Sequence, residues 1–303
     1  MLTTLSQRLI QFKRIAVLID LASDSENVVR YAGSLARWYG SELFFVHALG
    51  AELHAASPSA TPPRQPASGV SAKQGAEATI RALIDKLSLK DLAPRLIVRE
   101  ASIGKILQEV DEHHPSLVVV ATHGREGVRK WVAGSVAEEV FRRVQWPVLV
   151  LGPGFSVEVA LQKQFEHILY ATDLSAVSLA ALQYAAGISH DHEAHLTVLY
   201  VEPDPKQGFS FDRAMAQQRL HDWLQDHIDG LAETLVGVRC VADFGKPEEK
   251  IVEAASEPQA DLVILGARGL GTGAGAASHF LGGTAYGVAC TSRSPTLIVP
   301  QPR

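Results

Sequence analysis

The sequence is poor in cysteine and has no long apolar run, and each shortage excludes a class of protein. Its 303 residues include two cysteines, Cys240 and Cys290, too few for a disulfide framework. No apolar stretch approaches the roughly 18 residues of a membrane helix, and residues 1–14 lack the apolar core of a secretion signal. The formal net charge of −5 argues against bulk nucleic-acid binding. We therefore expect a cytoplasmic protein that binds neither nucleic acid nor membrane.

Several catalytic motifs are also missing. The twelve histidines include no His-x-x-x-His zinc pair with a general base, and there is no cysteine cluster. The sequence has no Gly-x-Ser-x-Gly elbow and no P-loop, which argues against an α/β-hydrolase and a motor-type ATPase. The stretches HDH (190–192) and HH (113–114) are expected at helix ends or in connecting loops, where solvated polar residues are common.

What the sequence does contain is a long internal repeat. The matching stretches, with offsets that change only by loop-sized amounts, are FKRIAVLIDLAS (12–23) with FEHILYATDLSA (165–176), SLVVVATHG (116–124) with DLVILGARG (261–269), and Pro147 with Pro295. A fixed long period indicates a duplicated unit. We therefore predict two domains of the same kind, residues 1–152 and residues 153–303.

Each half alternates short apolar strands with amphipathic helices. This alternation predicts a parallel sheet with helices on both faces, that is, an α/β fold with two doubly wound domains of five strands each. The last strands, PVLVL (147–151) and PTLIV (295–299), can lie side by side, so that the domains pack as a pseudo-two-fold pair and cover each other's sheet edges. The sequence leaves open whether the chain also forms a homodimer.

A glycine-rich loop follows the fourth strand of the first half, in ATHGREGVRKWVAGS (121–135). A helix that begins at Gly134-Ser135 offers free N–H groups and a positive dipole end, which together suit a phosphate. The loop also carries three cations, Arg125, Arg129 and Lys130. The alternative interpretation is a plain helix cap with Ser135 as the capping residue.

The second half has a longer version of this loop, GARGLGTGAGAASHFLGGT (266–284). Twelve residues, rather than nine, separate its two framing glycines; Gly283 stands in the place of Ser135, and Arg268 is the nearby cation. An aspartate also follows the first strand of each half, Asp20 or Asp173. Such a carboxylate can accept hydrogen bonds from a base or a ribose, or it can cap the next turn.

On these motifs, each half resembles a universal stress protein domain, over nearly the whole chain. The ATP-binding pattern of that family, Gly-x2-Gly-x9-Gly-(Ser/Thr/Asn) with an acid after the first strand, is matched here by Ala121-x2-Gly124-x9-Gly134-Ser135 with Asp20. The second half reads Gly266-x2-Gly269-x12-Gly282-Gly283, with Asp173. The resemblance implies an adenine-nucleotide ligand: ATP, with or without Mg²⁺, or AMP or ADP.

The resemblance also implies a role for each matching residue. Asp20 or Asp173 would receive the adenine amino group, and the backbone at Ala48 or Val201 would face the base. His123 or Arg268 would lie beside the ribose or phosphates. The phosphate-holding residues would be Gly124, Gly134, Ser135 and Val136 in the first half, and Gly269, Gly282, Gly283 and Thr284 in the second. Ala121 replaces the first glycine of the pattern, as it does in some members of the family. Because the second loop is lengthened, lacks the serine and has only Arg268 as a nearby cation, the first half is favoured for triphosphate binding.

Two classes of function follow. The leading hypothesis is an ATP-binding stress-response or signalling protein, which hydrolyses ATP slowly if at all. The alternative is a tandem scaffold or interaction protein in which the loops are vestigial. An adenine-cofactor enzyme of similar fold would need a flavin or sulfur site, and the sequence contains no motif for either.

Overall fold

The computed structural model describes residues 8–21, 25–49, 71–122, 135–143, 145–162, 165–203, 212–228, 235–256, 259–268 and 281–301. The chain divides into two compact units. We call Phe12–Arg142 the first unit, and Met1–Gln11 together with Arg143–Arg303 the second unit.

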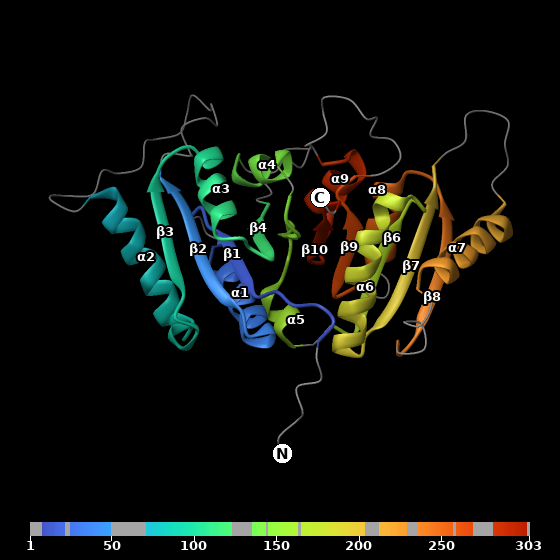
Figure 1. The fold of residues 1–303 in the computed structure, drawn as a ribbon, viewed down its shortest axis with the longest axis horizontal. Coiled ribbons are helices and arrows are strands. Elements are labelled where there is room, and N and C mark those ends of the chain that lie inside the picture. The colour runs from blue at the N-terminus through green and yellow to red at the C-terminus, as the bar shows by residue number, and fades with distance from the viewer. Residues whose placement is uncertain are drawn as a thin grey trace, which may run out of the picture. The chain divides into compact units, whose positions relative to one another are not determined.

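The first unit is a parallel sheet with helices packed against it (Figure 1). Its strand order is β3-β2-β1-β4. The strands are β1 (Arg14–Leu18), β2 (Glu42–Leu49), β3 (Arg95–Glu100) and β4 (Leu117–Ala121). The helices are α1 (Ser25–Tyr39), α2 (Ala72–Lys86), α3 (Ile103–Glu112) and α4 (Ser135–Arg142), with a short 3₁₀ helix η2 (Lys90–Leu92).

In the second unit the strands follow the order β5-β10-β9-β6-β7-β8. All neighbouring strands are parallel except β5 and β10. The strands are β5 (Val148–Leu151), β6 (His167–Thr172), β7 (His195–Glu202), β8 (Val238–Phe244), β9 (Leu262–Gly266) and β10 (Thr296–Val299). The helices are α5 (Val157–Gln162), α6 (Leu179–His192), α7 (Arg213–His227), α8 (Pro247–Ser256) and α9 (Gly283–Thr291), with the 3₁₀ helix η3 (Ala176–Ser178).

The repeat seen in the sequence is confirmed by these elements. The order β3-β2-β1-β4 recurs as β8-β7-β6-β9. Strands β2 and β7 have 8 residues each, helices α2 and α7 have 15 each, and helices α3 and α8 have 10 each. The predicted α/β fold, with a mostly parallel sheet flanked by helices in both repeats, is therefore correct.

The last strands of the two repeats lie side by side, as expected from PVLVL and PTLIV. Strands β5 and β10 pair antiparallel, with Leu149 opposite Leu297. These two leucines occupy the same place in their repeats, one residue after a strand-starting Val148 or Thr296. Pairing of equivalent residues in antiparallel strands is the mark of a local two-fold axis. The two strands are therefore related to each other by local two-fold symmetry.

Alternating residues of the second unit's strands pack on different helices. Leu169, Ala171, Leu199 and Val201 form one core cluster with residues of α8 and α9, among them Ile251 and Val288. Because successive side chains of a strand point to opposite faces, Tyr170 and Thr172 lie on the other face. There, the hydroxyl group of Tyr170 donates to the carbonyl oxygen of Ser178, just before α6 (2.8 Å). Helices therefore cover both faces of this sheet.

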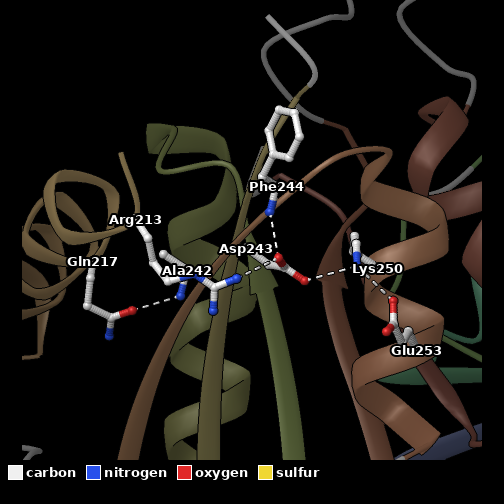
Figure 2. Close-up of polar contacts among 7 residues, drawn as sticks. All are labelled: Arg213, Gln217, Ala242, Asp243, Phe244, Lys250 and Glu253. Carbon is white, nitrogen blue, oxygen red and sulfur yellow. Dashed lines mark hydrogen bonds and ion pairs between the residues drawn. The ribbon is translucent and has the colours of Figure 1, made fainter. Parts of the chain in front are cut away.

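A glutamine side chain covers the outer edge of β8, which ends this sheet. The Gln217 amide on α7 donates to the carbonyl oxygen of Cys240 (2.6 Å) and accepts from the backbone N–H of Ala242 (2.8 Å). Figure 2 shows Gln217 reaching Ala242 from its helix. The two bonds satisfy a donor and an acceptor that an outermost strand otherwise presents to solvent.

A short N-terminal segment is fixed to the end of α6. The carboxylate of Asp191 accepts hydrogen bonds from the backbone N–H groups of Leu9 and Ile10, at 2.9 Å each. The Asp191 side chain is 1% exposed. Ile10 also packs against Gly187, where an added methyl group would lie 2.7 Å from its Cγ1 atom. The expectation that the stretch 190–192 is a solvated helix end is thus wrong for Asp191, which is buried against this segment.

The same helix end holds a histidine whose titration we expect to affect stability. Burial, together with the charge of Arg8, lowers the pKa of His192 from 6.5 to about 4, although the Asp191 carboxylate opposes the shift. As the pH falls, His192 is therefore protonated in the unfolded chain before it is protonated in the folded protein. The stability that its neutral form contributes to the fold is fully present above pH 6.5 and is lost as the pH falls towards 4. Urea unfolding of the natural chain and of His192→Gln, measured from pH 7 to pH 4, should show a smaller pH dependence in the variant. The exposed His221 provides the control, because His221→Gln should keep the slope of the natural chain. Equal slopes for His192→Gln and the natural chain would contradict the assignment.

Candidate functional site

A cavity of about 430 Å³ lies at the carboxyl ends of the strands of the second unit. This is the edge of a parallel sheet at which α/β proteins bind ligands, and the volume lies within the usual range for ligand pockets. Its walls come from the ends of β6, β7 and β9 and from the first turns of α8 and α9. The lining residues are Ala171, Thr172, Asp173, Ser178, Leu199, Tyr200, Val201, Pro203, Pro247, Ile251, Leu265, Gly266, Ala267, Arg268, Gly282, Gly283, Thr284 and Ala285.

The structure gathers most of the second-half residues named from the sequence around this cavity. Those that line it are Asp173, Val201, Gly266, Arg268, Gly282, Gly283 and Thr284. They come together because β6 pairs with both β7 and β9, so the ends of all three strands meet at one edge. Gly269 lies outside the described residues.

A sharp backbone turn positions Asp173. Leu174, directly after it, has a φ of 60°, in the left-handed region that a leucine seldom adopts. Oδ1 of Asp173 accepts hydrogen bonds from the backbone N–H of Ser175 (3.2 Å) and from its hydroxyl group (2.5 Å). Asp173 therefore caps the turn through Oδ1, which was one of its two interpretations from sequence, and the turn holds the carboxylate at the cavity.

A buried network of hydroxyl groups lies beside this turn, and the sequence analysis did not predict it. The hydroxyl groups of Thr172 and Ser178 lie 3.0 Å apart, and Ser178 donates to the carbonyl oxygen of Ser175 (2.7 Å). Thr172 accepts from the backbone N–H of Leu174 (3.0 Å). Burial raises the pKa of Tyr170 to about 12, so its hydroxyl group stays protonated as a donor. The network fixes the turn that carries Asp173.

The start of α9 forms the opposite end of the cavity. Gly282 is its N-cap, in an extended conformation, and the Gly282 N–H donates to the carbonyl oxygen of Ala267 (2.8 Å). The first N–H groups of a helix have no acceptor within the helix, and here they border a cavity. Among the described residues, a methyl group added to Gly283 would meet no neighbouring atom within 4 Å, so this part of the structure leaves the backbone open to a ligand.

Arg268 and Asp173 are the charged side chains of the described lining. Arg268 follows β9 by two residues and is partly buried. Gly266, at the end of β9, approaches the backbone closely: an added methyl group would lie 3.3 Å from the carbonyl oxygen of Arg268. The cavity is otherwise mostly apolar, with one carboxylate and one guanidinium group.

The first unit places the equivalent residues at the same edge of its own sheet. Asp20 follows β1, Ala48 lies near the end of β2, and Ala121 ends β4. Since β1 pairs with both β2 and β4, these three strand ends adjoin. Leu21 has a φ of 60°, as Leu174 does, and the Ser25 hydroxyl group donates to Oδ1 of Asp20 (3.2 Å). The two repeats therefore share the left-handed leucine directly after the aspartate.

The phosphate end of the first-half site is described only in part. Helix α4 begins at Ser135, and Val136 is its second residue. His123, Gly124 and Gly134 lie outside the described residues. The preference for triphosphate in this half therefore stays a prediction from sequence.

Among the described residues, no group of three or more His, Cys, Asp or Glu side chains could hold a metal ion. No described helix is long and apolar enough to cross a membrane.

The comparisons with known proteins agree with this architecture. The universal stress protein family model matches residues 11–152 and again residues 164–300. A universal stress protein encoded in the QAH/OAS sulfhydrylase 3′ region of Thermus aquaticus is 32% identical over 140 residues, which cover 45% of this chain and 98% of that protein.

Solved structures resemble the whole chain or one half of it. A universal stress protein from Archaeoglobus fulgidus shares 18% identity with a TM-score of 0.63, covering 96% of this chain and 97% of that one. A universal stress protein in complex with cAMP matches 46% of this chain and 98% of its own, at 25% identity and a TM-score of 0.36. With the family model matched twice and the same strand order in both repeats, the chain belongs to the universal stress protein family and carries two family domains in tandem.

Proposed function

We propose that the chain is an adenine-nucleotide-binding stress-response or signalling protein with two domains, residues 1–152 and 153–303, each carrying a nucleotide site. The observation that carries the proposal is the cavity of the second unit, where seven residues singled out by the sequence motif meet. In this proposal the protein acts by binding, with hydrolysis at most slow.

The strand-end side of the cavity suits the adenine ring. Leu199, Val201, Leu265 and Ile251 supply apolar surface there, and burying a flat ring against apolar side chains is favourable. The carboxylate of Asp173 is an acceptor for the amino group of adenine. A hydrogen bond of this kind, to a charged group, typically contributes about 1.5–3 kcal/mol.

The helix side of the cavity suits phosphate. The N–H groups of Gly283 and Thr284 belong to the first turn of α9, where the helix dipole favours an anion. Arg268 supplies a guanidinium group at the same end, and Thr284 a hydroxyl group. Adenine near Asp173 and phosphate near α9 would give the nucleotide one defined direction in the cavity.

A side chain at Gly283 should block the phosphate end without harming the fold. Because an added methyl group there contacts no neighbouring atom of the described residues within 4 Å, we expect Gly283→Val to fold, with its branched side chain in the space proposed for phosphate. We expect the affinity of the second-half site for AMP to fall about tenfold, equivalent to about 1.4 kcal/mol, as measured by titration calorimetry.

Gly75→Val is the matched control for this variant. Gly75 is also near the start of a helix and also has no atom within 4 Å of an added methyl group, but it lies in α2. AMP affinity should be unchanged there. Equal affinity in all three proteins, or no nucleotide binding by the natural chain, would instead support the tandem scaffold.

A further inference from the structure

We infer that the second-unit cavity prefers an adenine nucleotide with one phosphate over ATP, and that Glu248 sets this preference. The inference rests on the proposed function, because it concerns how many phosphates the same site accepts. It is drawn from the charges around the start of α9.

The phosphate end of this cavity is poor in positive charge. Arg268 is the cation of its described lining. The sequence from Gly269 to Leu281 contains no lysine and no arginine. One guanidinium group and the helix N-terminus can balance a single phosphate, whereas each further phosphate adds negative charge without a new partner.

Glu248 places a carboxylate beside this end. It is the second residue of α8, next to Pro247, which lines the cavity. Its side chain packs on Gly287 of α9, where an added methyl group would lie 2.9 Å from Oε2 of Glu248. Gly287 is four residues after Gly283, which is about one helical turn, or ~6 Å along the axis. The carboxylate of Glu248 therefore lies about one helical turn from the place proposed for phosphate, so its negative charge disfavours each further phosphate there.

The lysines near Glu248 are engaged by other carboxylates. Lys246 is 2.7 Å from Glu249, and Lys250 bridges Glu253 at 2.9 Å and Asp243 at 3.4 Å. Figure 2 shows Lys250 between the two acids, with Arg213 on the far side of Asp243. Drawing either lysine towards a phosphate would break these ion pairs.

The first half has the opposite charge balance in its sequence. Counting from the starts of the equivalent helices, Glu248 corresponds to Gly104, and Gly287 corresponds to Glu139. At these two positions each repeat thus has one carboxylate, Glu139 in the first half and Glu248 in the second. The first loop, however, carries Arg125, Arg129 and Lys130 against one acid, Glu126, so positive charge exceeds negative charge there even when Glu139 is counted. The number of phosphates accepted should therefore differ between the halves.

The test is calorimetric titration of the full chain with AMP and with Mg-ATP at an ionic strength of about 0.1 M, in a Gly134→Val background that impairs the first-half site. A second variant in this background, Asp173→Asn, weakens the second-half cavity. The binding heat that this variant loses is therefore the heat that comes from that cavity. Glu248→Gln removes the charge but keeps the shape of the side chain. Glu166→Gln is its control, because Glu166 is exposed and precedes β6, about 20 Å of strand from the cavity and beyond the screening length of ~10 Å.

We expect AMP to bind at least about tenfold more tightly than ATP. Glu248→Gln should narrow this ratio by raising ATP affinity, while Glu166→Gln should leave it unchanged. Equal or tighter ATP binding in the starting protein, or an unchanged ratio in Glu248→Gln, would overturn the inference. Binding of neither nucleotide, or binding that is indifferent to Asp173→Asn, would overturn the proposed function instead.

Discussion

Replacing Gly152 by alanine should strongly destabilise the second unit. Gly152 directly follows β5, and a methyl group on it would overlap with the carbonyl oxygen of Ser292. That oxygen cannot move aside easily, because the backbone N–H of Ser292 donates to the carbonyl oxygen of Val288 (2.8 Å) and its hydroxyl group donates to the carbonyl oxygen of Ser294 (3.0 Å). Overpacking of this kind costs about 3 kcal/mol, which urea unfolding monitored by circular dichroism would measure.

The same substitution at Gly75 should have the opposite sign. Gly75 lies within α2, and an added methyl group meets no atom within 4 Å. Alanine is favoured over glycine in a helix by about 0.5–1 kcal/mol, so Gly75→Ala should unfold at slightly higher urea. If Gly152→Ala unfolded at the same urea concentration as the natural chain, the close approach of Gly152 to Ser292 would be contradicted.

The two aspartate turns should respond differently when ATP is titrated. We expect Asp20→Ala to remove the tight phase of ATP binding and Asp173→Ala to leave it, because the first half has the nine-residue spacing, Ser135 and the greater number of cations. A lost charge-assisted hydrogen bond of about 1.5–3 kcal/mol corresponds to a loss of affinity between about tenfold and a hundredfold. Calorimetry with Mg-ATP measures both phases.

Asp173 also caps a turn, so asparagine variants are needed beside the alanine variants. Asparagine keeps an oxygen that can accept from Ser175, as Oδ1 of Asp173 does, but it has no charge. A further control is Asp91→Ala, which removes a carboxylate paired with Arg37 at the surface. If the tight phase survived Asp20→Ala and disappeared with Asp173→Ala, the second-half site would be the stronger one for ATP.

Much of the fold could be predicted from the sequence because the strands are buried on both faces. In the sequence such strands are unbroken apolar runs, like LVVVA in β4 and LVILG in β9. The repeat offset then predicts the same strand order for both halves. The position of Asp173 after β6 could be predicted for the same reason, since strand ends are visible where an apolar run stops.

Other parts of the site leave no local signal. The cavity wall formed by Pro203, Pro247 and Ile251 depends on how α8 packs, and no motif spacing connects these residues. Leu174 adopts a left-handed backbone conformation. A glycine or asparagine would have predicted this conformation from the sequence, but a leucine does not. The sequence predicted Asp191 to be solvated, because its hydrogen-bond partners, Leu9 and Ile10, are about 180 positions away in the sequence.

The glutamine on α7 has a consequence for how the sheet of the second unit ends. A parallel sheet can in principle recruit another extended chain along its outermost strand, and this is a common start of aggregation. At Cys240 and Ala242 that place is taken by the amide of Gln217, which donates one hydrogen bond to β8 and accepts one from it, as a peptide unit of a neighbouring strand would. The Gln217 side chain thus takes the place of one peptide unit of a further strand. Another chain would have to displace this side chain before pairing with β8.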